Sequence, residues 1–406
     1  MKGKLVSALA LWAGLLTVSA VLGGPLTMPG ERYRAPAPRS ADGAQLRLRQ
    51  PDLRAHNIRL PALSPAPRLQ LESGRLRIGQ GRALPALDSA GLSWTELADG
   101  GLVATLILES PQAAALRLQL SADSPLPEGV ELKLFAPDAP DGEIIALQRR
   151  DLPPGRPYWS PTLTGARLGL ELYLPPGVEP EALALSLPRL SHLALAPTAL
   201  LDPRRLIDIG NAASCEIDVA CDASGVPQLI IDSVAKILFS NGLGSSFACT
   251  GTLLNDTDPG SQIPYLLTAN HCVGNEVEAT SLEAYWFFQR ASCSGPDPTS
   301  VTRTNGATLL SGGSDTDYSL LRLTQDPPNG VGLSGWSAQT VAPEAAVFGL
   351  HHPAGDLKKI SRGSVQGLTL VNIIDFGLVS AIQTRWQSGV TEPGSSGSGL
   401  WRNSGG

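Results

Sequence analysis

The sequence predicts an all-β protein, and three observations support this prediction. From about residue 90 to 195, short apolar runs alternate with polar residues at a period of two, and Pro, Gly and Asp separate these runs at intervals of about ten residues. This spacing is typical of an antiparallel β-sandwich. After residue 210 the chain is again rich in strand-like runs without long helical periodicity, which favours a second all-β domain of two closed sheets.

The N-terminus predicts an export signal. Lys2 and Lys4 precede a nearly uncharged apolar run from Leu5 to Leu22, which ends in small residues. We therefore predict a cleaved signal peptide over residues 1–23 and a secreted protein. A membrane anchor is the alternative, because the run is about long enough to span a bilayer. After signal removal we expect no membrane association.

The composition narrows the choice of partners. The chain has 406 residues, 42% of them hydrophobic and 17% charged, and a formal net charge of −6. This is the composition of a soluble globular protein with more than one domain. Its charge offers no basic surface for a nucleic acid, so we expect no such partner. We expect a monomer.

Composition also divides the chain into segments. Residues 24–88 are rich in Pro, Arg and Ala, which predicts a flexible or extended segment. The predicted sandwich occupies residues 89–196 and a linker residues 197–209. The second β-rich domain then covers residues 210–406.

The predicted sandwich carries no constellation of His, Cys or paired acids. In its run "AALRLQLSAD", Leu116, Leu118 and Leu120 would face one way and Arg117 the opposite way. His192 stands alone, so we expect it at the surface or in packing rather than as a ligand.

Individual strands are also predicted after residue 210. The segment "SVAKILFSNGLGSSFACTGTLLND" predicts two strands joined at Asn241-Gly242, which is a hairpin signal. Further strands are expected in "SLEAYWFFQRASC" and "DYSLLRLT". Two more surround the turn in "EAAVFGLHHPAGDLKKISRGSV".

All five cysteines lie in the second domain: Cys215, Cys221, Cys249, Cys272 and Cys293. In an exported protein such a cluster favours disulfides over a metal site. No pair has the close CxxC spacing of a zinc site, and the neighbours His351 and His352 would point to opposite faces of a strand. We therefore expect no metal and no cofactor. The odd number leaves one thiol free or without its partner.

Three fragments of the second domain carry candidate chemistry. His271 follows an apolar strand in "YLLTANHCV", Asp317 precedes one in "SDTDYSLLRL", and Ser396 lies among glycines in "EPGSSGSGLW". Singly, each has an ordinary explanation: a structural histidine, a turn-capping aspartate and a Gly/Ser loop. Together they follow the order His, Asp, Ser, which is that of chymotrypsin-like proteases and not of subtilisins or α/β-hydrolases.

The fragments "TGTLLND", "PYLLTANHC", "DYSLLRL", "HHPAGDLKKIS" and "GVTEPGSSGSGLW" resemble the bacterial lysyl endopeptidase branch of the trypsin/chymotrypsin-like serine proteases. "SCEIDVAC", residues 214–221, is similar to the start of the mature enzyme in that branch. The resemblance covers about residues 210–406. It implies a chymotrypsin-like double β-barrel with the active site in the cleft between the barrels. It also implies that the N-terminal half is a propeptide.

The same resemblance implies that His271 is the general base, Asp317 the acid that orients it, and Ser396 the nucleophile. A neutral imidazole takes the serine proton during attack, and a buried carboxylate fixes the tautomer and stabilises the imidazolium. The amides of Gly394 and Ser396 are the predicted oxyanion hole. The expected reaction is hydrolysis of peptide bonds in protein or peptide substrates through an acyl-enzyme, with basic P1 residues as the family default.

Other residues compete for these roles on composition alone. They are Asp315, Ser395 and Ser398. The glycine frame and the resemblance favour Ser396, and the aromatic-then-leucine run after position 317 favours Asp317.

The resemblance also implies a disulfide framework. Cys249 pairs with Cys272 and Cys221 with Cys293, whereas Cys215 would pair with a cysteine after the nucleophile. The sequence ends before such a residue. We therefore expect an incomplete second barrel in which Cys215 is unpaired.

Two other functions remain open on the sequence. A catalytically inactive adhesion or binding protein on a protease-like fold is the alternative to a secreted endopeptidase precursor. Residues 90–195 could also be a carbohydrate- or surface-binding module instead of a prodomain. The mature start is expected near Gly210, and Arg204-Arg205 offers a nearby basic site for activation by another protease.

Overall fold

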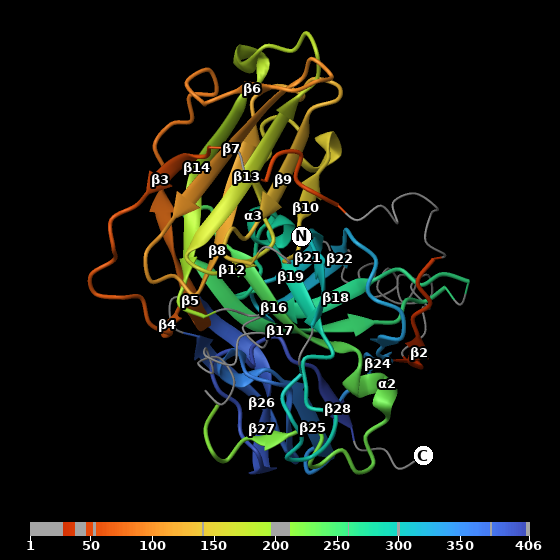
Figure 1. Cartoon of the computed structure of the whole chain (residues 1–406). Coiled ribbons are helices and arrows are strands. Elements are labelled where there is room, and N and C mark those ends of the chain that lie inside the picture. Colours follow the sequence, from red (N-terminus) through yellow and green to blue (C-terminus); the bar gives the residue numbers. More distant parts are fainter. Residues whose placement is uncertain are drawn as a thin grey trace, which may run out of the picture.

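The structure is a computed structural model that describes residues 27–36, 46–51, 54–139, 142–195, 212–258, 260–298, 301–373 and 376–402. The predicted signal peptide and the predicted linker lie outside the described residues. Figure 1 shows two β-rich parts. We call residues 56–195 the sandwich and residues 212–402 the C-terminal part.

The sandwich consists of two facing sheets. One has the order β10 (Ile145–Leu147), β9 (Glu131–Phe135), β13 (Arg167–Leu174), β7 (Leu102–Glu109) and β3 (His56–Arg59), with β6 (Thr95–Glu96) paired to β7. The facing strands are β11 (Tyr158–Trp159), β12 (Leu163–Thr164), β8 (Ala115–Ala122), β14 (Leu185–Leu193), β5 (Arg75–Ala83) and β4 (Gln70–Glu72). Leucines such as Leu106 and Leu118 are fully buried between the sheets, so the period-two prediction is confirmed.

Regular strands occur within residues 24–88, the segment whose composition predicts a flexible or extended chain. The described part contains β3, β4 and β5, together with the short strands β1 (Thr27–Met28) and β2 (Glu31–Arg32). In β5, Leu76 and Ile78 are buried. These strands form because distant sheets supply their hydrogen-bond partners, which composition averaged over the segment does not reveal.

The first half of the C-terminal part is a closed sheet. Its strands are β16 (Val234–Ser240), β17 (Ser246–Leu254), β18 (Tyr265–Ala269), β19 (Glu283–Trp286), β20 (Thr302–Asn305), β21 (Ala307–Gly313) and β22 (Tyr318–Leu323). Gly306 connects β20 directly to β21, which are the two end strands of this paired series. The sheet therefore closes around a core that includes Phe239, Trp286 and Leu321. The short helices α2 (Gln228–Ile231) and α3 (Glu276–Thr280) lie beside it.

A second sheet follows, with the order β15 (Ile217–Asp218), β26 (Lys359–Ile373), β25 (Ala346–His351) and β28 (Leu400–Arg402); β27 (Gly377–Ser388) pairs with β26. In the described residues this sheet stays open, as the sequence predicts. The connection between the two halves carries β23 (Gly332–Leu333) and β24 (Trp336–Ser337). Short 3-10 turns occur at η1 (Arg149–Asp151), η2 (Pro180–Ala182) and η4 (Pro353–Gly355).

Strand β5 joins the sandwich to the C-terminal part. It pairs with β14 on one side and with β17 on the other, so a single sheet of 13 strands runs through both parts (Figure 1). Arg117 does face away from the leucines of β8, but it is buried against the C-terminal part. Its guanidinium donates to Ser240 Oγ at 2.9 Å and to the Ser281 carbonyl at 2.6 Å. The polar face of the sandwich is thus an internal interface.

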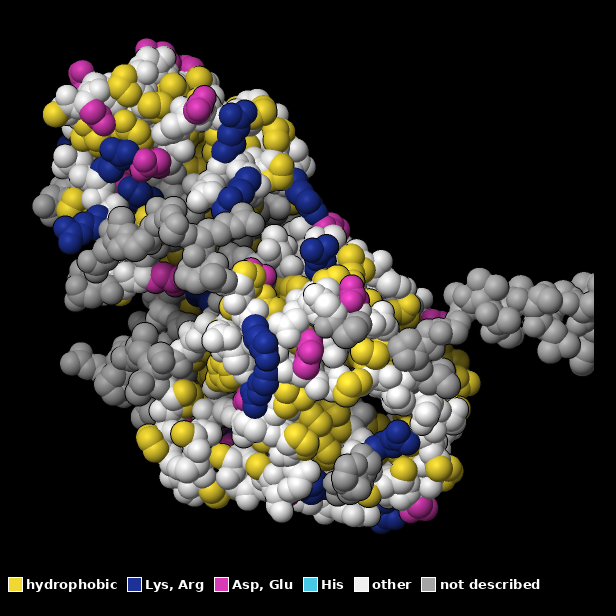
Figure 2. Space-filling view, turned by 90° about the vertical axis from the view of Figure 1, so that its right-hand side faces the viewer, with side chains coloured by type: hydrophobic (Ala, Val, Ile, Leu, Met, Phe, Trp, Pro, Cys, Tyr) yellow, Lys and Arg dark blue, Asp and Glu magenta, His cyan; other side chains and the backbone are white. Residues whose placement is uncertain are grey.

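On the face shown in Figure 2, basic side chains are scattered among acidic and apolar ones. Within the described ranges, no helix has an apolar stretch long enough to span a bilayer. His192 is buried, and its Nδ1 lies 2.7 Å from Ser110 Oγ. It therefore has a packing role in the sandwich.

Candidate active site

The neighbouring strands β18 and β22 bring His271 and Asp317 together. They pair in antiparallel register with Ala269 opposite Tyr318. His271 comes two residues after Ala269 and Asp317 directly precedes Tyr318, so both lie just beyond the same end of the paired strands. His271 Nδ1 is 2.6 Å from Asp317 Oδ2, and the His271 amide donates to Asp317 Oδ1 at 2.7 Å. Asp317 has a φ of 52°, a left-handed conformation that aspartate tolerates better than most residues. Asp315 is exposed and lies outside this pair.

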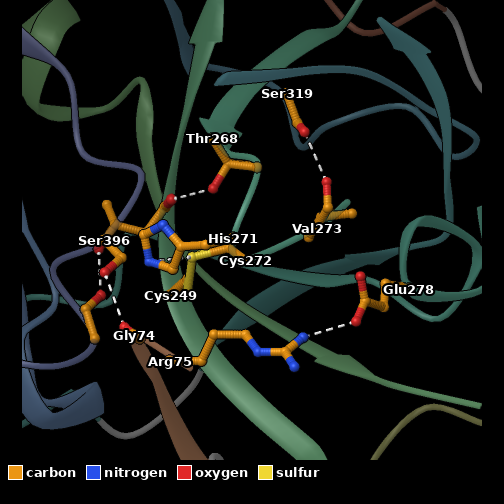
Figure 3. The surroundings of a disulfide bond; sticks show 12 residues. Gly74, Arg75, Cys249, Thr268, His271, Cys272, Val273, Glu278, Ser319 and Ser396 are labelled. Atoms are coloured by element: carbon orange, nitrogen blue, oxygen red, sulfur yellow. Dashed lines mark hydrogen bonds and ion pairs between the residues drawn. A yellow bond between two sulfur atoms is a disulfide. The ribbon is translucent and has the colours of Figure 1, made fainter. Parts of the chain in front are cut away.

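Ser396 comes from the other half of the C-terminal part, in the loop between β27 and β28. Thr250 of β17 holds this loop: its amide donates to the Ser396 carbonyl at 2.8 Å, and its Oγ1 donates to the Gly394 carbonyl at 2.9 Å. Position 397 must be glycine, because an added Cβ would lie 2.2 Å from Thr268 Oγ1. Figure 3 shows Ser396 beside the ring of His271.

The competing serines lie differently. Ser395 is buried, and its hydroxyl lies 2.8 Å from His351 Nδ1 and accepts the Glu392 amide at 3.1 Å. Ser398 donates its amide to the Ser395 carbonyl. Ser396 thus lies beside His271, whereas the Ser395 hydroxyl contacts His351.

The predicted oxyanion amides lie in the same loop. Gly394 has a φ of 102°, and an added Cβ would lie 2.7 Å from the His352 carbonyl. In the described part of the chain, no intramolecular acceptor is assigned to the amide of Gly394 or of Ser396.

Two disulfides brace this region. Cys249 is bonded to Cys272 and Cys221 to Cys293, while Cys215 is exposed and has a free thiol. The first disulfide lies directly beside the candidate site, with Cys272 Sγ at 3.8 Å from His271 Nε2 (Figure 3). In the chain-entropy model a loop of this size contributes about 3 kcal/mol.

The adjacent histidines His351 and His352 form hydrogen bonds around the loop that carries Ser396. His351 Nε2 lies 3.0 Å from Ser361 Oγ, and His352 donates its amide to Thr250 Oγ1 at 3.0 Å. Among the described residues, no group of three or more His, Cys, Asp or Glu side chains is arranged to hold a metal ion.

Sequence comparisons identify the family. Residues 209–406 match the family model of the lysyl endopeptidase C-terminal domain, and residues 49–194 match that of the lysyl endopeptidase N-terminal domain. The chain is 34% identical over 354 residues to a lysyl endopeptidase of Pseudomonas aeruginosa, with 84% of this chain and 74% of the relative covered.

The chain belongs to the lysyl endopeptidase family. It is therefore a serine-type endopeptidase.

More distant similarities accompany this match. A secreted RxLR effector protein of Plasmopara viticola is 28% identical over 172 residues, which is 41% of either chain. The crystal structure of Deg5 has a TM-score of 0.31 and 16% identity, covering 43% of this chain and 77% of its own. The active form of the Rv3671c protease from M. tuberculosis has a TM-score of 0.30 and 17% identity, covering 45% and 70%. These scores are low, so the family assignment rests on the sequence matches.

A turn from the N-terminal region lies against the candidate residues Ser396 and His271. Ser73 and Gly74, between β4 and β5, have φ values of 50° and 77°. Ser396 Oγ donates to the Gly74 carbonyl at 3.5 Å, and a Cβ on Gly74 would lie 3.1 Å from His271 Cδ2. Figure 3 shows this turn against both residues. Sequence reasoning missed it; the only local signal is the Ser-Gly turn before an alternating run.

Arg75 anchors this turn to the endopeptidase. Its guanidinium contacts Glu278 Oε1 at 2.7 Å and lies 4.1 Å from the ring centre of Phe247. Both charged side chains are largely buried, at 15% and 7% exposure. A desolvated ion pair over an aromatic ring fixes the position of the turn.

Phe376 is a second residue that the sequence did not single out. Its ring lies edge-on to the His271 imidazole, with the ring centres 5.9 Å apart. It belongs to the tip of the β26–β27 hairpin, far from His271 in sequence, and only the tertiary fold brings it here.

Glu216 is a buried carboxylate near His351. Its side chain is 1% exposed, and its Oε2 lies 3.9 Å from His351 Nε2. Burial, and then the nearby Glu392, raise the pKa of Glu216 from 4.5 to about 7. Burial lowers the pKa of His351 to about 4, so this histidine is neutral at pH 7 and does not offset the carboxylate.

We expect Glu216→Gln to raise the free energy of unfolding at pH 8 and to leave it unchanged at pH 4. As pH rises from about 4.5 to about 7, Glu216 keeps its proton in the folded chain but loses it in the unfolded chain, where its pKa is lower. The free energy of unfolding therefore falls as pH rises through this range. Glutamine removes the titration. Denaturant unfolding at both pH values tests this, and an equal difference at pH 4 and pH 8 would contradict it.

Proposed function

We propose that this chain is a secreted endopeptidase precursor in which His271, Asp317 and Ser396 act as base, orienting acid and nucleophile. The observation that carries the proposal is the 2.6 Å contact between His271 Nδ1 and Asp317 Oδ2, with Ser396 beside the same ring. Export follows from the apolar N-terminal run, residues 1–23.

The proposed reaction uses these groups in sequence. His271 Nε2 takes the hydroxyl proton of Ser396 as its oxygen attacks the scissile carbonyl, and Asp317 stabilises the imidazolium that forms. The amides of Gly394 and Ser396 donate to the oxyanion. Protonation of the leaving amine by His271 gives the acyl-enzyme, which water hydrolyses by the same steps.

We propose residues 24–209 as the pro-region and residues 210–406 as the endopeptidase domain. The Gly74 turn supports this division, because a substrate carbonyl cannot approach Ser396 while the turn is in place. Cleavage near Arg204-Arg205 or Gly210, followed by departure of the turn, would open the site.

A preference for basic P1 residues is proposed from the family and from one local charge. A cavity of about 460 Å³ beside the nucleophile is lined by Leu71, Gly74, Thr391, Glu392, Pro393, Ser395 and Ser396. Glu392 is its acidic side chain. Leu71 and Gly74 belong to the proposed pro-region and would leave with it, whereas Glu392 would remain to meet a lysine or arginine side chain of the substrate.

Active-site labelling tests the proposal. The full-length chain is treated with a fluorophosphonate probe before and after cleavage near residue 204 and removal of the N-terminal region. We expect label on the peptide that contains Ser396 in the cleaved sample, none in Ser396→Ala, and normal labelling in Ser398→Ala. Peptide substrates with lysine, arginine or leucine at P1 then measure specificity. Absence of label after removal of the N-terminal region would favour the inactive binding protein instead.

A further inference from the structure

A second element of the N-terminal region docks far from the active site. Residues 27–34, which we call the strap, contain β1 and β2, and these pair with β24 and β23 in the connection between the two halves of the endopeptidase. In Figure 1 the strap lies on the opposite side of the endopeptidase from β4 and β5. It precedes the matched N-terminal family domain, which begins at residue 49.

Tyr33 is the apolar anchor of the strap. It is 3% exposed. It belongs to the hydrophobic core of the closed sheet in the first half of the C-terminal part, together with Val331 and Leu333. Its amide donates to the Val331 carbonyl at 3.0 Å, and its hydroxyl donates to Asp326 Oδ1 at 3.0 Å. Burial and this carboxylate raise the pKa of Tyr33 well above its ordinary value, so the phenol stays a donor.

Arg32 supplies the charged contact. Its Nη1 donates to Asp232 Oδ2 at 2.6 Å and to the Gly330 carbonyl at 2.7 Å. The side chain of Asp232 is 9% exposed, so the ion pair is partly shielded from solvent. Two acidic groups, Asp232 and Asp326, thus flank the Arg-Tyr pair.

Most of the remaining contacts involve the backbone of the strap, and one involves the side chain of Glu31, whose Oε1 accepts from Gln262 Nε2 at 3.1 Å. Asn255 Nδ2 donates to the Pro29 carbonyl at 2.9 Å, and Gln262 accepts the Arg34 amide at 2.8 Å. Position 30 is close to the groove floor, because a Cβ on Gly30 would lie 2.9 Å from the Gly335 amide nitrogen. The hydrogen bonds described for the strap go to the endopeptidase part and none goes to the described sandwich residues.

We propose that the groove under the strap is a peptide-binding exosite of the endopeptidase, specific for an extended segment with arginine followed by tyrosine. In the uncut chain its occupant is the chain's own strap, which holds the pro-region independently of the turn in the active site. Main-chain pairing to β23 and β24 gives affinity, and the Tyr33 pocket with its two acids gives specificity. The inference goes beyond the proposed catalytic function and requires no turnover.

The test uses the full chain with Ser396→Ala and a site for a sequence-specific protease inserted after Arg205. After cleavage, the dissociation of the N-terminal fragment from the C-terminal fragment is measured by dilution and gel filtration. We expect Tyr33→Ala to raise the dissociation constant at least 10-fold and Tyr33→Phe to have a smaller effect. Arg34→Ala, whose side chain is exposed, is the matched control and should change it less than 2-fold.

Hydrogen exchange in the uncut chain covers the case in which Tyr33→Ala disturbs folding. This variant should lose amide protection at residues 330–337 and keep it at residues 246–248, where β5 pairs with β17. A synthetic peptide of residues 26–36 should restore protection at 330–337, and the same peptide with Tyr33→Ala should not. Equal dissociation constants for Tyr33→Ala and Arg34→Ala, or no restoration by the peptide, would overturn the proposal.

Discussion

Substitution of Ser396 by alanine should lower kcat for peptide hydrolysis about 10⁶-fold, and His271→Ala should do the same, because the two residues act as one unit. Asp317→Asn should lower it about 10⁴-fold, since the amide leaves the imidazole in the wrong tautomer. The short contact of His271 Nδ1 with Asp317 Oδ2 is the geometry on which this order of effects depends.

The measurement uses the endopeptidase after removal of its N-terminal region, with kcat and KM determined separately on one peptide substrate. Asp315→Asn and Ser398→Ala are matched controls, because each changes the same side-chain type a few residues away from the proposed group. They should alter kcat by less than about 3-fold. If Asp315→Asn were as damaging as Asp317→Asn, the assignment of the orienting acid would be wrong.

The second large effect concerns the turn in the active site. In the uncut chain, Gly74→Val should raise the rate of fluorophosphonate labelling at Ser396 by about 10-fold or more. Gly74 has a φ of 77°, and a Cβ there would lie 2.8 Å from Ile373 Cγ2. A β-branched residue at such a φ costs about 1–2 kcal/mol before the clash is counted, and about 1.4 kcal/mol already corresponds to a 10-fold change in occupancy.

Gly177→Val is the matched control for this experiment. Gly177 has a φ of 81° but no atom within 4 Å of an added Cβ, so it carries the same backbone strain without a clash and lies in the sandwich. Its labelling rate should equal that of the wild-type chain. A Gly74→Val chain that remains folded and labels no faster than Gly177→Val would show that the turn does not restrict access to Ser396.

The sequence by itself determined the alternating strands after residue 90 and the order of the candidate groups, and its resemblance to the family gave the cysteine pairing. Alternation in β7, β8 and β13 is visible locally because each strand has one face in an apolar core. His271 and Asp317 could be paired in advance because each lies at a strand end in a motif that the family shares. These signals are short in sequence and need no knowledge of distant partners.

Only the tertiary structure decided what the polar faces and the N-terminal segments contact. Arg117 was correctly placed opposite the leucines of β8, yet nothing in "AALRLQLSAD" indicates that this face is covered by protein. The Gly74 turn and Tyr33 contact residues about 200 to 320 positions away in the sequence. The residue pattern within a strand does not show which distant strand it pairs with. The reason is physical: period-two alternation specifies which side of a strand is buried, whereas long-range packing selects the surface that buries it.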